Sequence, residues 1–113
     1  VKNVLKDNGI LYALTVKSTH AFGLPKDWYE WNPTCHHGEA GTMDDIERFL
    51  RDDGALLFFL WGHAFEFDRD DNWELMEKIA GRLGGRDDIW YCTNGELYSW
   101  LARFRAASGI SAT

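Results

Sequence analysis

The run Ala55-Leu56-Leu57-Phe58-Phe59-Leu60-Trp61-Gly62-His63 contains the longest unbroken stretch of apolar residues in the sequence and ends in a histidine. The turn residue Gly54 precedes it, and the acidic residues Glu66 and Asp68 follow. An apolar run without alternation is typical of a strand buried on both faces, as in a parallel sheet covered by helices. Because α/β proteins usually place their chemistry just past the carboxyl ends of such strands, the pattern indicates His63 as the candidate catalytic residue.

Outward from this run, the chain alternates between helical and extended patterns. Two further strands are expected over Ile10–Val16 and Ile89–Thr93, and an acidic loop over Glu66–Asp71. Four helices are expected: one entering at Val1 and ending at Asn8-Gly9, one from Thr42 to Gly54, one from Asp71 or Asn72 to Gly84, and one from Asn94 through Phe104, followed by a frayed tail over Ser108–Thr113. This order predicts an α/β fold with about three parallel strands, alternating with four helices through right-handed crossovers.

Composition limits the partners of the chain. The 113 residues are enough for one small domain, and the net charge of −6 argues against a nucleic-acid partner, which needs a basic patch. No apolar run reaches membrane-spanning length, so we expect no membrane partner. Three parallel strands alone would leave two unprotected edges, and an open edge is a template for pairing. We therefore expect self-association through the open sheet edges.

The segment Lys17–Gly41 is a long loop, and loops of that length are more often functional than not. Trp28 and Trp31 either form a platform that stacks on sugar rings or anchor the loop on the fold. His36 and His37 either contact substrate or order the loop through hydrogen bonds. With Cys35 and His63 they could also hold zinc, although no regular ligand spacing is present and neighbouring residues rarely chelate one ion together.

Four short motifs stand out along the chain. They are Asn8-Gly9-Ile10-Leu11-Tyr12-Ala13, Pro33-Thr34-Cys35-His36-His37, Leu60-Trp61-Gly62-His63, and Ile89-Trp90-Tyr91-Cys92-Thr93-Asn94-Gly95-Glu96-Leu97. Together they resemble polysaccharide deacetylases of the NodB type, and the resemblance covers nearly the whole chain as the C-terminal part of the family domain. It implies that residues 1–113 form a single partial domain, part of an irregular (β/α) barrel.

The resemblance also implies a function, the removal of acetyl groups from a polysaccharide by hydrolysis with a divalent metal, commonly zinc. His63 would be the general acid that protonates the leaving amine, a task suited to a side chain that titrates near neutral pH. Leu60 and Trp61 would line the pocket for the acetyl methyl group, and His36 or His37 would contact substrate. Glu66 or Asp68 would orient His63 or bind sugar hydroxyls; the other interpretation of these acids is a solvated loop beside a helix N-terminus.

The family's paired-aspartate motif and its His-x-x-x-His metal motif have no counterpart in this sequence. We therefore expect no metal ligand set within this chain, and expect the base and metal ligands of the family to be missing. Two other functions stay open at this point. The chain is either a non-catalytic carbohydrate-binding or structural module that uses its aromatic loop, or a small zinc-binding protein that uses Cys35 and the histidines.

Overall fold

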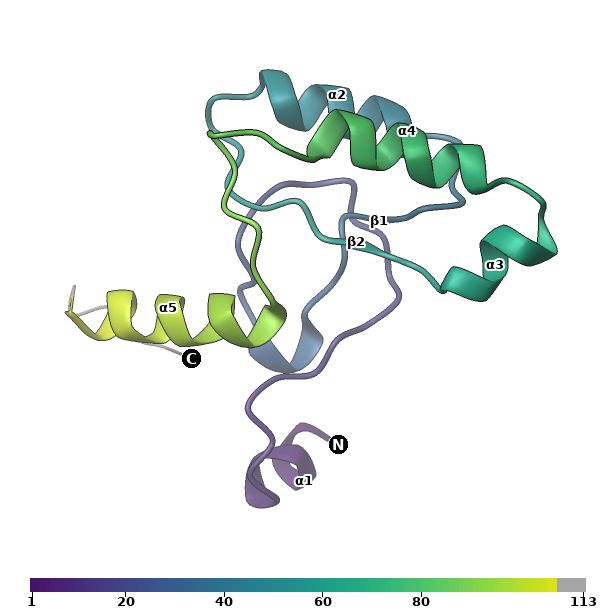
Figure 1. Cartoon of the computed structure of the whole chain (residues 1–113). Helices are drawn as coiled ribbons and strands as arrows, with labels where there is room; N and C mark the ends of the chain where they lie inside the picture. The colour runs from purple at the N-terminus through teal and green to yellow at the C-terminus, as the bar shows by residue number, and fades with distance from the viewer. Residues whose placement is uncertain (108–113) are drawn as a thin grey trace.

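The computed structural model describes residues 1–107 of the chain (Figure 1). Within that range the backbone forms five α-helices, one 3₁₀ helix and two short strands. In chain order these are α1 (Lys2–Asp7), η1 (Trp28–Glu30), β1 (Cys35–His36), α2 (Thr42–Arg51), β2 (Leu60–Trp61), α3 (Ala64–Arg69), α4 (Trp73–Leu83) and α5 (Asn94–Ala107). The tail expected over Ser108–Thr113 lies outside the described residues.

The sheet has two parallel strands, β1 and β2, with Cys35 opposite Leu60 and His36 opposite Trp61. The prediction of a partial (β/α) barrel with three parallel strands is therefore wrong. In the run Ala55–Trp61 only the last two residues form a strand, because its earlier residues bond loop positions instead. The N–H groups of Leu56 and Leu57, for example, both donate to the carbonyl of Phe22 at 2.9 Å.

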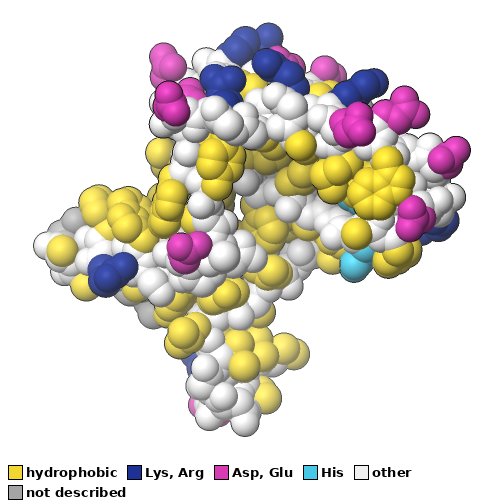
Figure 2. Space-filling view, in the orientation of Figure 1, with side chains coloured by type: hydrophobic (Ala, Val, Ile, Leu, Met, Phe, Trp, Pro, Cys, Tyr) yellow, Lys and Arg dark blue, Asp and Glu magenta, His cyan; other side chains and the backbone are white. Residues whose placement is uncertain are grey.

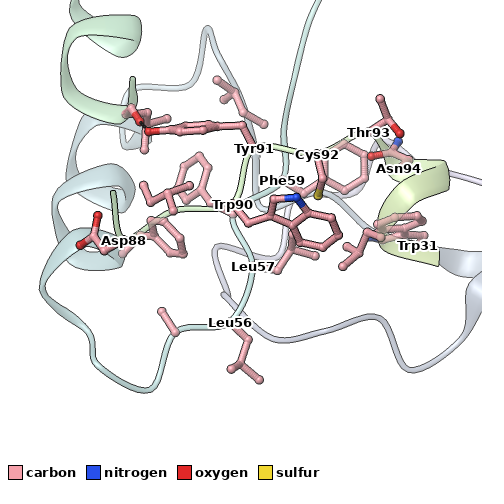
Figure 3. Close-up of a pocket in the computed structure, with 17 residues that line it drawn as sticks. Trp31, Leu56, Leu57, Phe59, Asp88, Trp90, Tyr91, Cys92, Thr93 and Asn94 are labelled. Carbon is pink, nitrogen blue, oxygen red and sulfur yellow. Dashed lines mark hydrogen bonds between the residues drawn. The ribbon is translucent and has the colours of Figure 1, made fainter. Parts of the chain in front are cut away.

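The other two expected strands also lack a ladder. Ile10–Val16 makes a single parallel bridge, between Leu14 and Trp31. Ile89–Thr93 forms no strand in the structure, and it lines a cavity of about 550 Å³ together with Leu56–Leu60 (Figure 3). No backbone hydrogen bond joins the two segments within residues 1–107, so the alternation of patterns does not become a continuous sheet.

The helices are the more predictable part of the fold. The first helix ends where expected, with Asn8 as its C-cap and Gly9 at a φ of 76°, a left-handed conformation that suits glycine. Helices α2 and α4 lie side by side (Figure 1), and a two-pronged ion pair joins Arg82 to Glu47 at 2.6 and 2.7 Å. The acidic loop expected over Glu66–Asp71 is wrong, because most of it belongs to helix α3.

The main hydrophobic core lies where the aromatic loop meets α5. Its buried members are Trp28, Trp31, Leu97 and Leu101. The Trp28 and Trp31 rings meet edge to face at 5.3 Å, a favourable aromatic geometry. This cluster anchors the long loop and so fixes the start of β1, which follows Trp31 by four residues.

Much apolar surface remains exposed on the described residues. Figure 2 shows hydrophobic side chains gathered along α5, where Trp100 and Phe104 stack at 5.3 Å and are about half exposed. None of the described helices is both long enough and apolar enough to cross a membrane.

Candidate functional site

The site forms where β1 ends and the chain turns. Successive side chains of a strand point to opposite faces, so neighbouring histidines in a strand cannot share one site. His36 is the last residue of β1, and His37 already lies in a turn closed by the Glu39 N–H on the His36 carbonyl, at 3.2 Å. The turn brings the two imidazole rings together, stacked with centroids 4.3 Å apart.

The neighbouring strand β2 leads directly into α3 and supplies two more members. His63 is the N-cap of α3, and Glu66 is its third residue. Glu66 reaches back so that Oε1 accepts the His63 backbone N–H at 2.8 Å, which is one half of a capping box. Parallel pairing of β1 with β2 then places His36, His37, His63 and Glu66 side by side, and we call these four residues the His/Glu cluster.

Glu66 is the shared acceptor of the His/Glu cluster. Its Oε1 accepts the ring N–H at Nδ1 of His63 at 2.9 Å, and its two oxygens lie 3.1 and 3.0 Å from Nε2 of His36. Burial would raise the pKa of the Glu66 carboxyl, but the hydrogen bonds from His36 and from the His63 backbone and ring lower it to about 2. Glu66 is therefore a buried, permanently ionised carboxylate at neutral pH.

His37 is the most enclosed imidazole of the cluster, with 5% of its surface exposed. Its ring stacks on Phe67 at 4.2 Å, and its Nδ1 and Cε1 pack directly over the backbone of Gly62, where a Cβ would overlap them. Burial is the main cause that lowers the pKa of His37, so this ring is neutral. Neither ring nitrogen of His37 has a hydrogen-bond partner within residues 1–107.

His63 is the exposed member of the cluster. Its side chain is 59% exposed, and histidine surface is visible beside the start of α3 in Figure 2. Because Nδ1 donates to Glu66, Nε2 is the ring atom free to meet a ligand, and no described residue bonds it. Trp61 walls one side of the cluster, with its indole edge-on to His36 at 4.7 Å and to His63 at 5.8 Å.

The structure brings together some of the residues predicted for the site and separates others. Leu60 precedes Trp61 on β2 and lines the separate cavity described above. Asp68 lies on α3 outside the cluster and accepts the indole N–H of Trp73 at 2.7 Å. Trp28 and Trp31 are 5% and 2% exposed, so in this fold they anchor the loop and present no open ring face to a sugar.

Cys35 does not join the histidines. It is fully buried on β1, and burial raises the pKa of its thiol to about 11. Because alternate residues of a strand face opposite sides, Cys35 points away from the side that His36 occupies. The four-residue zinc set of Cys35, His36, His37 and His63 is therefore not assembled in the described fold.

The bond from His36 to Glu66 was not predicted, because the segment was interpreted as an acidic loop. Orientation of His63 by Glu66 or Asp68 was predicted, and Glu66 Oε1 accepts the His63 Nδ1–H at 2.9 Å. The sequence does carry one signal for it. His63-Ala64-Phe65-Glu66 has the spacing of a capping box, in which the residue before a helix is bonded by a glutamate three positions later. This spacing, which the prediction did not use, favours Glu66 over Asp68 as the partner of His63.

The chain was compared with family models, curated proteins and solved structures. No family model, curated protein or solved structure matches the chain.

Proposed function

We propose that this chain contributes the proton-donating residues of a metal-dependent hydrolase that removes acetyl groups from a polysaccharide. The resemblance of its motifs to NodB-type deacetylases suggests the reaction, hydrolysis of an amide carbon–nitrogen bond. The observation that carries the proposal is the pairing of Glu66 Oε1 with His63 Nδ1 at 2.9 Å beside an exposed Nε2. A carboxylate that holds one ring nitrogen while the other faces outward is the arrangement of an oriented acid–base histidine.

His63 supplies the proton in this proposal. Amide hydrolysis releases an amine, which is a poor leaving group until its nitrogen is protonated. Glu66 fixes the ring through Nδ1 and through the backbone N–H, so Nε2 is held toward the outside of α3. The negative charge of Glu66 also balances a positive imidazolium. The proton passes from Nε2 to the leaving nitrogen as the carbon–nitrogen bond breaks.

Trp61 supplies an apolar wall for the acetyl methyl group. Its ring contacts both His36 and His63, so a methyl group packed on the indole would lie within reach of the proton donor. In the family that the motifs resemble, a bound divalent metal activates the attacking water. His36 donates to Glu66 and so reinforces the orientation of His63.

A binding and turnover experiment tests this proposal. The chain is labelled with ¹⁵N and titrated with an N-acetylglucosamine oligomer and, separately, with the matching free-amine oligomer. We expect the ring signals of His63 and the indole signal of Trp61 to move with the acetylated oligomer and to move less with the free amine. Acetate release is measured, with zinc added, on an active polypeptide that supplies the base and metal ligands together with this chain. There it should fall about 100-fold or more in His63→Gln, because general acid catalysis contributes at least that much.

His20→Gln is the matched control, since it removes a histidine of the same type that lies outside the cluster. It should bind and turn over like the parent chain. Equal acetate release by His63→Gln and the parent, or no movement of the His63 and Trp61 signals with any acetylated oligomer, would rule out the proposal.

A further inference from the structure

We propose that His36, His37 and Glu66 form a binding site for a divalent transition metal, with zinc as the expected ion. The proposal rests on three observations about these residues: the separation of their donor atoms, the enclosure of His37 and the charge of Glu66. It stands apart from the proposed function, because metal binding is measured without substrate and does not require His63 to act as an acid.

The separation of the donor atoms is the first observation. One nitrogen from each of the two histidines and one oxygen of Glu66 all lie within 4.8 Å of one another. Zinc bonds to imidazole nitrogen at about 2.0–2.1 Å and to carboxylate oxygen at about 2.0–2.2 Å, so ligand atoms around one ion are separated by about 3–4 Å. Small side-chain movements therefore suffice to close the three donors around an ion.

The state of His37 is the second observation. His37 as a whole is only 5% exposed, yet its ring nitrogens still reach solvent and bond no other residue within 1–107. The ring is held in place by stacking on Phe67 and by packing over Gly62. A neutral imidazole offers one ring-nitrogen lone pair to a metal. An ion at this position would therefore displace no hydrogen bond of His37.

The donor set and its charge are the third observation. Two imidazoles and one carboxylate, with a further position left for water, is a set that zinc uses in catalytic sites. Glu66 Oε1 already accepts the two N–H groups of His63, whereas Oε2 has only His36 at 3.0 Å and Arg69 at 3.7 Å. Oε2 is thus the oxygen available to an ion, and Arg69 is the positive charge that opposes one.

The hydrogen bonds of His36 give the proposal a specific signature. Its Nδ1 accepts the Gly38 backbone N–H at 2.9 Å, so its proton lies on Nε2 and is donated to Glu66. An ion that binds Nε2 displaces that proton, which moves to Nδ1 and breaks the bond from Gly38. Metal binding by His36 should therefore release the Gly38 amide, a change that metal bound elsewhere would not produce.

A second group of polar side chains provides the comparison within the molecule. His20 lies between Asp45 at 2.6 Å and Glu39 at 3.2 Å. Both ring nitrogens of His20 already face carboxylates, so that group is satisfied as an ion pair and leaves no vacant donor. The His36–His37–Glu66 site differs because His37 has no partner.

The experiment uses the untagged full chain and cobalt(II), whose visible absorption reports ligand geometry, with zinc as the competitor. We expect one cobalt per chain with the intense bands of a four-coordinate site, and loss of those bands when zinc is added. NMR with zinc should show the His36 proton on Nδ1 and a shifted Gly38 amide. His37→Gln and Glu66→Gln should each weaken binding at least about tenfold, the loss caused by removing even an outer-shell partner.

Two variants keep the outcome decisive. Arg69→Gln removes the opposing charge and should tighten binding, which a merely unfolded or damaged site would not do. His20→Gln should leave binding unchanged. Absence of four-coordinate cobalt bands overturns the proposal. So does binding that survives in both His37→Gln and Glu66→Gln, or that is lost equally in His20→Gln.

Discussion

Glu66 Oε1 accepts both the backbone N–H and the ring Nδ1–H of His63, at 2.8 and 2.9 Å. The same oxygen therefore caps helix α3 and fixes the exposed imidazole beside it. The start of α3 and the orientation of the His63 ring therefore both depend on Glu66 Oε1, because His63 is at once the N-cap of the helix and the solvent-exposed imidazole.

The first prediction replaces this acceptor. Glu66→Gln keeps the size of the side chain but removes its charge, so the two histidine rings lose their common anionic acceptor. We expect the Nδ1 proton of His63 to exchange faster with water and the ring to populate both tautomers, as seen in long-range ¹H–¹⁵N spectra. Glu47→Gln, which removes the same charge at the ion pair with Arg82, should leave the His63 signals unmoved. An equal effect of both variants would contradict the prediction.

The second prediction concerns Gly62, which has no side chain because His37 occupies the space. A Cβ at this position would overlap Nδ1 of His37 and lie 2.5 Å from its Cε1. Gly62→Ala should therefore lower the free energy of unfolding by about 1–3 kcal/mol, the usual result of overpacking, measured by urea denaturation. Gly23→Ala meets nothing within 4 Å and is the control. Equal stability of the two variants would show that His37 moves aside freely.

The third prediction is a pH dependence that originates at His20. The hydrogen bond to Asp45, supported by the charge of Glu39 and opposed by that of Arg48, raises the pKa of His20 above its ordinary value. A raised folded-state pKa means that the contribution to stability is fully present below the unfolded pKa, near 6.5, and is lost as pH rises through the folded value.

The comparison variant for this effect is His20→Asn. His20 has a φ of 54°, a left-handed conformation that asparagine tolerates better than most residues. The urea midpoint of the parent chain should exceed that of His20→Asn at pH 5.5 and lose this advantage by pH 9. A constant difference across that range would mean that the charge of His20 does not stabilise the fold.

The helices of this chain follow from local signals, whereas the sheet does not. Asn8-Gly9 ends α1 and Asn72 begins α4 as the sequence indicates, because caps and turns depend on residues only a few positions apart. Strand pairing depends on distant partners. Ile89–Thr93 has strand-forming composition, but no strand of the described residues pairs with it.

The candidate site divides in the same way. His63 is recognisable from its place after an apolar run. The approach of His36 and His37 depends on a turn after β1, and the position of Glu66 depends on a short helix that follows β2. Adjacent histidines give no regular ligand spacing, so the sequence alone does not indicate the cluster. It is recognised only once the parallel register is known, because His36 lies opposite Trp61 and so comes close to His63 and Glu66.

The last prediction is that the chain associates with itself through the segment Ile10–Val16. Ala13 and Thr15 bond toward Trp28 and Trp31, so the N–H and carbonyl groups of Leu14 face outward, with no partner within residues 1–107. Leu14 and Val16 are 48% and 70% exposed along the same edge. An apolar edge with free backbone groups is a template for a further strand.

Leu14→Lys places a charge on this edge and should shift the chain toward monomer, as measured by light scattering over a range of concentrations. Val4→Lys is the matched control, because Val4 is 62% exposed on α1, away from the edge. Association through this edge would be contradicted if the parent chain were monomeric at every concentration. It would also be contradicted if Leu14→Lys and Val4→Lys shifted the chain toward monomer equally. A selective effect of Leu14→Lys would assign the contact to the outward backbone groups beside Trp31.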